Sequence, residues 1–442
     1  MVAFGALGLL SIYILLVGTR NYEKCVRAML ILLLTVPLTS AEPINTIQLL
    51  RIGSVNVLEL GILELFIMGI FTGKLRWVKK DFISFSVLIL LGIYIVDLIL
   101  HLDNSRSVAD AKDYIIPAVF FFCIWSTIGK SVNAWEEFIQ ISLKALRMNA
   151  YMILVLYFAL WIPLGYSGRY GFPCETLYVY SIPVQLLSVH NKTVDKQDER
   201  KCIFGSLIQL WLLFLSQGRS LLICTIVAVA ICALMELCKK NTVKQVVKNV
   251  GVIVFMLVAL GFMYSYLMNN LNSNVGWVHR MAEVVNGGVN TSSNIIRNAL
   301  YIRYMSLIKE HPFGVGFGAS MPAYGYLNDG MLTLLGEETL AIDSVLLTFS
   351  YKLGIIPFIL YALCYLVVCY RLVRYKKNGN ITNSIFLILI LLIVPAAFLS
   401  CQALKNLNVA IFVSTLWGAS GKYGSIKVKQ EDALKKNAEE IC

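Results

Sequence analysis

The sequence predicts an all-α polytopic membrane protein with about 12–13 transmembrane helices. Of its 442 residues, 58% are hydrophobic and only 14% are charged, whereas soluble domains carry about 25% charged residues. Apolar stretches close to the ~20 residues that a spanning helix needs recur from Met1 to Tyr423. No block of the chain is polar enough or long enough to be an independent soluble domain.

Thirteen apolar segments are candidate spans. The first and the short one at 177–190 are the weakest, so twelve is an equally good count. The first, MVAFGALGLLSIYILLVGTR, has neither a basic leading region nor a small-residue cleavage site, and we expect it to be a retained helix. The segments lie near 3–19, 26–41, 55–73, 82–100, 114–129, 149–165, 177–190, 203–217, 220–237, 250–268, 344–370, 384–400 and 406–421.

The formal net charge of +12 is concentrated in short connections between the apolar segments. Such clusters mark cytoplasmic loops by the positive-inside rule, so they indicate membrane topology and not nucleic-acid binding. The resulting alternation places the N-terminus outside and the C-terminus inside. The clusters contain Lys74, Arg76, Lys79 and Lys80; Lys192, Lys196, Arg200 and Lys201; Lys239, Lys240, Lys244 and Lys248; Arg371, Arg374, Lys376 and Lys377.

The same alternation divides the chain into four parts. Residues 1–268 hold transmembrane helices 1–10 with short loops, and 269–343 form one long extracytoplasmic loop. Residues 344–423 hold the last transmembrane helices, and 424–442 form a cytoplasmic tail. Because loops longer than about 12–15 residues are uncommon unless functional, we expect the chemistry in the long loop.

The long loop contains an amphipathic stretch at 294–313 that ends at Pro312 and leads into HPFGVGFG at 311–318. Its apolar stripe is expected to hold Ile295, Ala299, Ile302, Met305 and Ile308. Gly314, Gly316 and Gly318 permit positive φ and close backbone approach, so their amides could form an anion-binding nest. The alternative is a turn that packs against the membrane face. No βαβ unit surrounds the glycines, which excludes a dinucleotide fingerprint.

Five arginines are expected on the outside, against the inside bias of positive charge. Arg219, in SQGRSLL between two apolar helices, is the sharpest, because a charge there is costly and by default functional. A guanidinium presents a planar fork suited to phosphate, and the alternative is snorkelling to lipid headgroups. If two or more converge, they predict an anionic, diphosphate-bearing substrate. The five are Arg169, Arg219, Arg280, Arg297 and Arg303.

A few acids are candidates for a general base beside an acceptor hydroxyl. Asp343 opens the segment after the long loop and Glu338 lies just before it, while Glu175 follows RYGFP. Asp343 suits a helix N-cap equally well. His311, beside the glycine turn, is a candidate substrate contact with a structural role as the alternative.

Other ionisable residues keep a transporter interpretation open. Glu59 and Glu64 lie near one face of an apolar segment, and Asp97 and His101 are four residues apart near an outer helix end. Acids within membranes can couple to protons or ions. The eleven cysteines have no paired spacing and no accompanying histidines, so neither a disulfide framework nor a metal site is indicated.

Three motifs in order resemble a known family. SQGRSLL between two helices, the arginine-bearing helix that ends in HPFGVGFG, and IDSVLLTFSYKLGI resemble the superfamily of Wzy-type polysaccharide polymerases and O-antigen ligases. The resemblance is close over roughly 160–360, and the helix layout is similar throughout.

The resemblance implies a GT-C-like glycosyltransferase fold in the bacterial inner (plasma) membrane, with an extracytoplasmic active site. It implies an undecaprenyl-diphosphate-linked glycan as donor, and no metal, nucleotide sugar or other cofactor. Arg219 and Arg303 would correspond to arginines that bind the diphosphate leaving group. A chain-length regulator is a further implied partner.

The resemblance also bears on which reaction is catalysed. Ligases commonly carry His-Asn eleven residues before the last glycine motif, and counting back from Gly354 gives Asp343 followed by Ser344. This departure favours a polymerase of O-antigen, capsule or exopolysaccharide repeat units over a ligase. A flippase or transporter is the alternative from another class, but no internal repeat of the kind common in transporters is evident.

Overall fold

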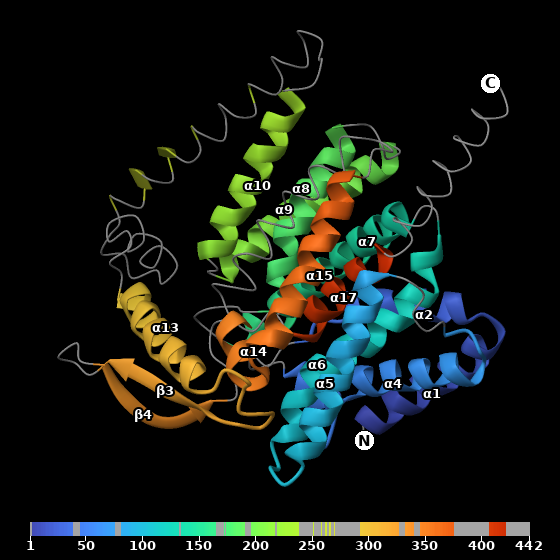
Figure 1. The fold of residues 1–442 in the computed structure, drawn as a ribbon. Helices are drawn as coiled ribbons and strands as arrows, with labels where there is room; N and C mark the ends of the chain where they lie inside the picture. Colours follow the sequence, from blue (N-terminus) through green and yellow to red (C-terminus); the bar gives the residue numbers. More distant parts are fainter. Residues whose placement is uncertain are drawn as a thin grey trace, which may run out of the picture.

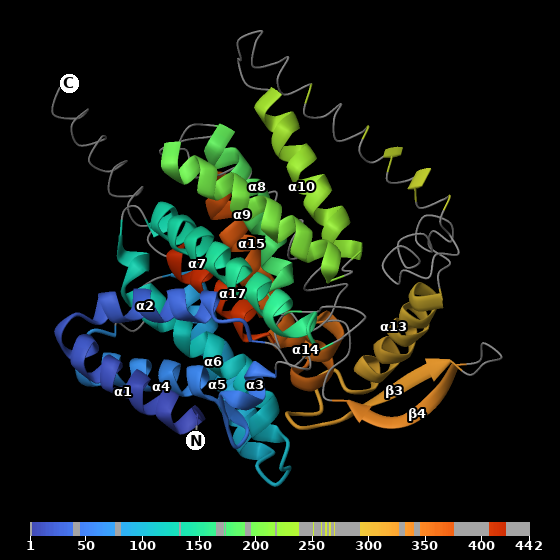
Figure 2. The ribbon, with the colours of Figure 1, turned by 180° about the vertical axis from the view of Figure 1, so that it is seen from behind.

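The computed structural model describes residues 2–38, 45–75, 81–131, 134–164, 172, 174–190, 196–216, 219–237, 292–326, 332–339, 345–374 and 406–420, with a few positions between 251 and 269. These residues are mostly helical and assemble into a bundle, shown from two sides in Figures 1 and 2. Of the expected sites, Arg169, Arg280 and Asp343 lie outside the described residues.

The N-terminal half of the bundle contains seven labelled α-helices and a minimal pair of strands within the described ranges. The helices are α1 (Val2–Arg20), α2 (Tyr22–Thr35), α3 (Thr46–Leu49), α4 (Val57–Phe71), α5 (Phe82–Leu100), α6 (Ser107–Ser126) and α7 (Ala134–Leu156). Strands β1 (Arg51–Ile52) and β2 (Val55–Asn56) pair antiparallel. A 3₁₀ turn follows α6 at Ile128–Lys130, and a π-helical turn extends α7 at Tyr157–Trp161.

The remaining described elements are helices apart from one hairpin in the long loop. They are α8 (Glu175–His190), α9 (Lys196–Leu215), α10 (Arg219–Leu237), α13 (Ser292–Glu310), α14 (Val345–Leu353), α15 (Ile355–Arg374) and α17 (Leu407–Ala419). Strands β3 (Met321–Tyr326) and β4 (Leu332–Thr339) pair antiparallel. Figures 1 and 2 show α13 and this hairpin beside α14 at one end of the bundle.

Helix boundaries follow local sequence signals. Asp81 caps α5 by accepting a hydrogen bond from the Ser84 amide at 3.1 Å. Asn56 and Glu59 form a capping box at the start of α4. Gly354, at φ 88°, divides the expected segment 344–370 into α14 and α15, because its left-handed backbone cannot continue a helix.

The core is built around α6 and α17. Every described residue of α17 from Asn408 onward is buried, and Phe120, Phe121 and Phe122 of α6 are at most 1% exposed. Such helices, apolar on all sides, are typical of the centre of a large bundle. Pro117 is accommodated within α6.

Four of the described helices are long and apolar enough to cross a membrane: Val2–Arg20, Phe82–Leu100, Ala134–Trp161 and Ile355–Leu372. Leu221–Ala233 and Leu407–Ala419 are shorter apolar helices. Seven of the other expected spans coincide wholly or partly with described helices, but α2 and α4 have only 14 and 15 residues. The protein is a membrane protein, and the count of 12–13 spans stays a prediction because 250–268 and 384–400 fall largely outside the described residues.

Helix α13 coincides with the expected helical stretch at 294–313, but the face that it buries differs from the expected stripe. Tyr304 and Ile308 are buried against Leu347 and Tyr351 of α14. Ile302 is 75% exposed, so the predicted stripe is wrong on this side of the helix. The large tyrosine ring buries more apolar area than the isoleucine and therefore decides which face packs.

Candidate active site

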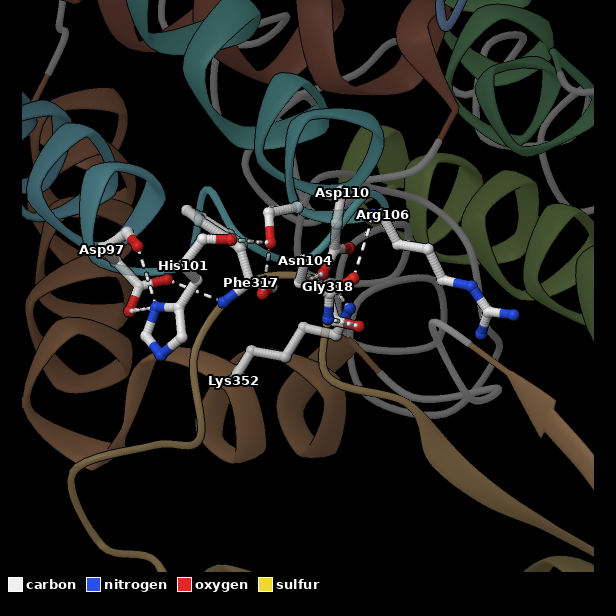
Figure 3. A network of polar contacts seen from close by, with 9 residues as sticks. Asp97, His101, Asn104, Arg106, Asp110, Phe317, Gly318 and Lys352 are labelled. Carbon is white, nitrogen blue, oxygen red and sulfur yellow. Dashed lines mark hydrogen bonds and ion pairs between the residues drawn. The ribbon is translucent and has the colours of Figure 1, made fainter.

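The candidate site is the glycine turn at 314–318, where segments far apart in the chain meet (Figure 3). Gly314, Gly316 and Gly318 have φ values of 89°, 91° and 80°. These left-handed conformations favour glycine, because a Cβ would be strained there. The expectation that the glycines permit positive φ and close approach is confirmed.

The turn is fixed through its backbone amides. The Gly314 amide donates to the His311 carbonyl at 3.0 Å, closing the turn locally. The next two amides donate to α14: Val315 to the Tyr351 carbonyl at 3.0 Å and Gly316 to the Lys352 carbonyl at 2.9 Å. The turn is therefore attached along the end of α14.

The last two amides of the turn donate to carboxylates that lie more than 200 residues earlier in the chain. Phe317 N–H donates to Asp97 Oδ2 at 2.7 Å, and Gly318 N–H donates to Asp110 Oδ2 at 3.0 Å. The amides do form an anion-binding arrangement, and in this structure the anions are two of the protein's own carboxylates. A substrate phosphate would have to displace them.

The connection between α5 and α6 holds the carbonyl groups of the same turn. Asn104 Nδ2 donates to the Gly318 carbonyl at 2.9 Å. Ser107 Oγ lies 2.9 Å from the Phe317 carbonyl and 2.6 Å from the His101 carbonyl, so its hydroxyl lies within hydrogen-bond distance of both. Residues 101–107 thus lie against the glycine turn of the long loop, which agrees with both being on one side of the membrane.

Close approach leaves no space for side chains at the turn. A Cβ on Gly316 would overlap the His101 imidazole, and one on Gly318 would lie 2.8 Å from Asn104 Nδ2. A Cβ on Gly354 would lie 2.6 Å from the Phe313 carbonyl carbon. Gly316, Gly318 and Gly354 are therefore required by packing as well as by their positive φ.

Beneath the turn, Asp110 and Lys352 form an ion pair in which both side chains are 0% exposed. Asp110 Oδ2 accepts from both Lys352 Nζ and the Gly318 amide, while Asp110 Oδ1 is buried with no hydrogen-bond partner among the described residues. A buried pair of this kind holds its elements in one arrangement, because separating the charges would leave each uncompensated. It ties α6 to α14.

Aromatic rings pack under the pair. The Phe317 ring lies 5.4 Å from Tyr114 and 6.3 Å from Tyr94, centroid to centroid, and Phe349 of α14 lies 5.6 Å from Tyr114. Tilted and edge-on contacts of this kind stabilise beyond the area they bury. Phe317 therefore anchors the turn into the bundle.

An open apolar groove of about 440 Å³ lies along α5 beside the turn. Its lining contains one charged residue, Asp97. The lining residues are Ile89, Gly92, Ile93, Val96, Asp97 and Leu100 of α5, with Phe313 and Leu353. Since α5 is a candidate membrane span, the groove offers an apolar chain a path from the bilayer to the turn.

The other predicted site residues lie on nearby or separate elements. Arg303 and His311 are exposed, the first on α13 and the second just after it. Glu338, in β4, pairs with Pro322 of β3. Arg297 lies in α13, Arg219 is the first residue of α10, and Glu175 is the first residue of α8. The structure brings the three glycines together with Asp97 and His101.

Sequence reasoning missed Asn104, Ser107, Asp110 and Lys352 as members of the site. A lysine in the apolar run SVLLTFSYKLG was an available signal, because ionisable residues within membranes are rare and are paired. The two acids noted in α4 have other partners: Glu59 binds Lys112 at 2.7 Å, and Glu64 accepts from Ser11 at 2.8 Å.

Residues 204–362 match the family described as O-antigen ligase, Wzy_C. The match begins within α9 and ends within α15, so it includes SQGRSLL, α13, the glycine turn and α14. It confirms the resemblance to the superfamily of Wzy-type polymerases and O-antigen ligases. Comparison with curated proteins and with solved structures found no match.

Proposed function

We propose that this protein is a polymerase that joins undecaprenyl-diphosphate-linked repeat units into O-antigen, capsule or exopolysaccharide on the outer face of the membrane. The observation that carries the proposal is the glycine turn, which lies within the matched domain and joins the arginine helix α13 to the ends of α5, α6 and α14. A membrane glycosyltransferase must bring a lipid carrier, a leaving diphosphate and an acceptor to one place. The groove, the arginines and the turn supply candidates for each.

The diphosphate is proposed to bind arginines. Arg303 is exposed on α13, the helix that leads into the turn. Arg219 begins α10 within the matched domain. As the glycosidic bond to the diphosphate breaks, negative charge grows on the leaving oxygens. Guanidinium groups already in place would stabilise that charge in the transition state. Arg169, Arg280 and Arg297, with Glu175 and His311, are further proposed contacts to the glycan or its diphosphate.

The polyprenyl chain is proposed to lie in the apolar groove along α5. An apolar groove open to the bilayer lets the chain enter without exposure to water, since the groove lining is as apolar as the lipid that it leaves. Asp97, which accepts from the Phe317 amide of the turn, is part of the groove lining, so a carrier lying in the groove could bring its diphosphate to the candidate site.

The acceptor is a hydroxyl group on another repeat unit, and it must lose a proton as it attacks the sugar C1. Asp343 and Glu338 are the acids of the long loop that sequence reasoning assigns to this step. A direct displacement would invert the anomeric centre. The aspartate at 343, where ligases commonly carry histidine, favours polymerisation over ligation.

The test is the size distribution of surface glycan in a deletion strain complemented with wild type or Arg219→Ala. We expect single repeat units in the deletion, a ladder with wild type, and no ladder with Arg219→Ala at a normal protein level. The matched control is Arg200→Ala, an exposed arginine of α9, which should restore the ladder.

Other outcomes would assign another activity. Full-length polymer accumulating on the lipid carrier in the deletion strain would identify a ligase. Lipid-linked single units trapped on the cytoplasmic face would identify a flippase. A normal ladder with Arg219→Ala would remove that arginine from the mechanism.

A further inference from the structure

The His101 imidazole is held in one tautomer by its neighbour Asp97. His101 caps the C-terminus of α5, and its Nδ1 lies 2.8 Å from the Asp97 backbone carbonyl oxygen and 3.3 Å from Asp97 Oδ1. A carbonyl oxygen can only accept a hydrogen bond, so Nδ1 must carry the proton. In the neutral ring, Nε2 therefore has a free lone pair.

The ring is also fixed in place. Gly316 lies against it so closely that a Cβ at that position would overlap the imidazole. Asp97 in turn is held by the Phe317 amide at 2.7 Å. Figure 3 shows the imidazole with one nitrogen turned toward Asp97 and the other directed away from the network. A fixed ring loses little entropy when it meets a substrate.

The outward nitrogen is available for chemistry. The His101 side chain is 36% exposed, and Nε2 has no hydrogen-bond partner within the described residues. Asp97, beside the ring, interacts in turn with the charges of Asp110 on α6 and Lys352 on α14, which form an ion pair with each other.

We propose that His101 is the general base of glycan transfer and that Asp97 is its positioning residue, an inference that rests on the proposed function. Nε2 takes the proton of the acceptor hydroxyl as that oxygen forms its bond to the sugar C1. The bond between C1 and the diphosphate oxygen breaks, and the lipid diphosphate leaves with the electron pair. The imidazolium then releases its proton to water or to the departed diphosphate, so atoms and charges balance.

This assignment replaces Asp343 and Glu338 as the base. An aspartate that orients a histidine through Nδ1 and stabilises the imidazolium is a recurring arrangement for a base that acts on hydroxyl groups. Here the imidazole comes from the connection after α5 and not from the long loop. Its neighbours Asp97 and Leu100 are part of the lining of the apolar groove.

The experiment uses the purified full-length protein in liposomes with lipid-linked repeat units extracted from the deletion strain. The single-turnover rate of chain extension is measured between pH 5 and 9. For the wild type we expect the rate to rise with pH, because a general base acts only in its unprotonated form. For His101→Gln we expect a loss of about 10²–10⁴-fold and a profile without that rise. His190→Gln, the same substitution at the end of α8, should keep the wild-type rate and profile.

A second variant separates catalysis from folding. His101→Ala leaves a space beside Gly316, and added imidazole should restore extension, with the rescued rate following the concentration of neutral imidazole. Asp97→Asn should lower the rate and leave the protein folded, since an amide oxygen can still accept from the Phe317 amide.

The outcomes distinguish this inference from the function on which it rests. An active wild type together with a His101→Gln variant of unchanged rate and profile would overturn the role of His101 alone. Loss of activity without imidazole rescue, together with a lower melting temperature, would show a structural role and overturn it too. A wild-type protein that extends no chain would overturn the polymerase proposal as well.

Discussion

Lys352 of α14 and Asp110 of α6 form an ion pair with both side chains fully buried, although 242 residues separate them in the chain. The same Asp110 oxygen accepts from the Gly318 amide, so one carboxylate joins two helices to the glycine turn. The pair therefore holds the α14 end of the matched domain against the N-terminal half of the bundle. Geometry at the candidate site depends on it.

Lys352→Met is expected to destabilise the protein by about 3–5 kcal/mol, because it leaves the Asp110 carboxylate buried without its cation. The double variant Lys352→Met/Asp110→Asn should recover part of this loss, since no uncompensated charge remains. Thermal unfolding of the purified protein in detergent measures both. Lys201→Met is the control, because the Asp198 partner of Lys201 is half-exposed. The melting temperature of this variant should equal that of the wild type. Equal melting temperatures for Lys352→Met and wild type would contradict the assignment.

Gly316→Ala is expected to disturb the turn, since the added methyl group would overlap the His101 imidazole at a φ of 91°. Strained backbone positions of this kind cost about 1–3 kcal/mol each. The rate of glycan extension should fall by more than the loss of folded protein explains, because the displaced His101 ring is the proposed base. Extension assays and thermal unfolding measure the two effects. Gly8→Ala in α1, where a Cβ meets nothing within 4 Å, is the matched control and should be neutral or stabilising. A fully active Gly316→Ala variant would show that the close contact is not needed.

Sequence patterns predicted individual helices well. The apolar window 82–100 coincides with α5, and the arginine stretch at 294–313 with α13. The hairpin β3–β4 was not predicted, because Pro322, Gly325 and Gly336 interrupt its strands and disfavour strand structure locally. Pairing between the two strands, with a register shift between Pro322 and Tyr324, overrides that preference. The residue preferences of one strand carry no information about the second strand with which it pairs.

The candidate site was predicted only in part for the same reason. HPFGVGFG was identified as a turn with unusual backbone, and Asp97 and His101 were noted as a pair on one helix. Their meeting could not be derived, because it depends on contacts over more than 200 residues, such as the 220 between Asp97 and Phe317. From the sequence alone, the pair only kept a transporter interpretation open, through proton or ion coupling. Only the packed structure places it against the turn.

Ser107→Ala should loosen the turn with little effect on the helices. Its hydroxyl lies within hydrogen-bond distance of the Phe317 and His101 carbonyls. The His101 carbonyl also accepts from the Asn104 amide at 3.1 Å, so the loss falls on the buried Phe317 carbonyl, at a cost of about 1–3 kcal/mol. Ser107→Thr keeps the hydroxyl and should retain more of the stability. Thermal unfolding compares the two. Equal stability of Ser107→Ala and wild type would indicate that water replaces the hydroxyl.

The contact between 101–107 and 314–318 also predicts the membrane topology. Segments that share hydrogen bonds must lie on one side of the bilayer, so cysteines introduced at Asp103 and Lys309, both exposed, should react alike. By the positive-inside rule that side is outside the cytoplasm. A maleimide that cannot cross membranes should label both positions in intact cells.

Glu199→Cys, at a partly exposed position in the basic region at the start of α9, is the matched control and should react only after the membrane is permeabilised. The described native cysteines are mostly buried, and the wild-type protein measures their background. Labelling at Asp103 without labelling at Lys309 would contradict the shared side. Labelling of Glu199→Cys alone in intact cells would show that the orientation is the reverse of the predicted one. The glycine turn and the proposed base would then lie in the cytoplasm.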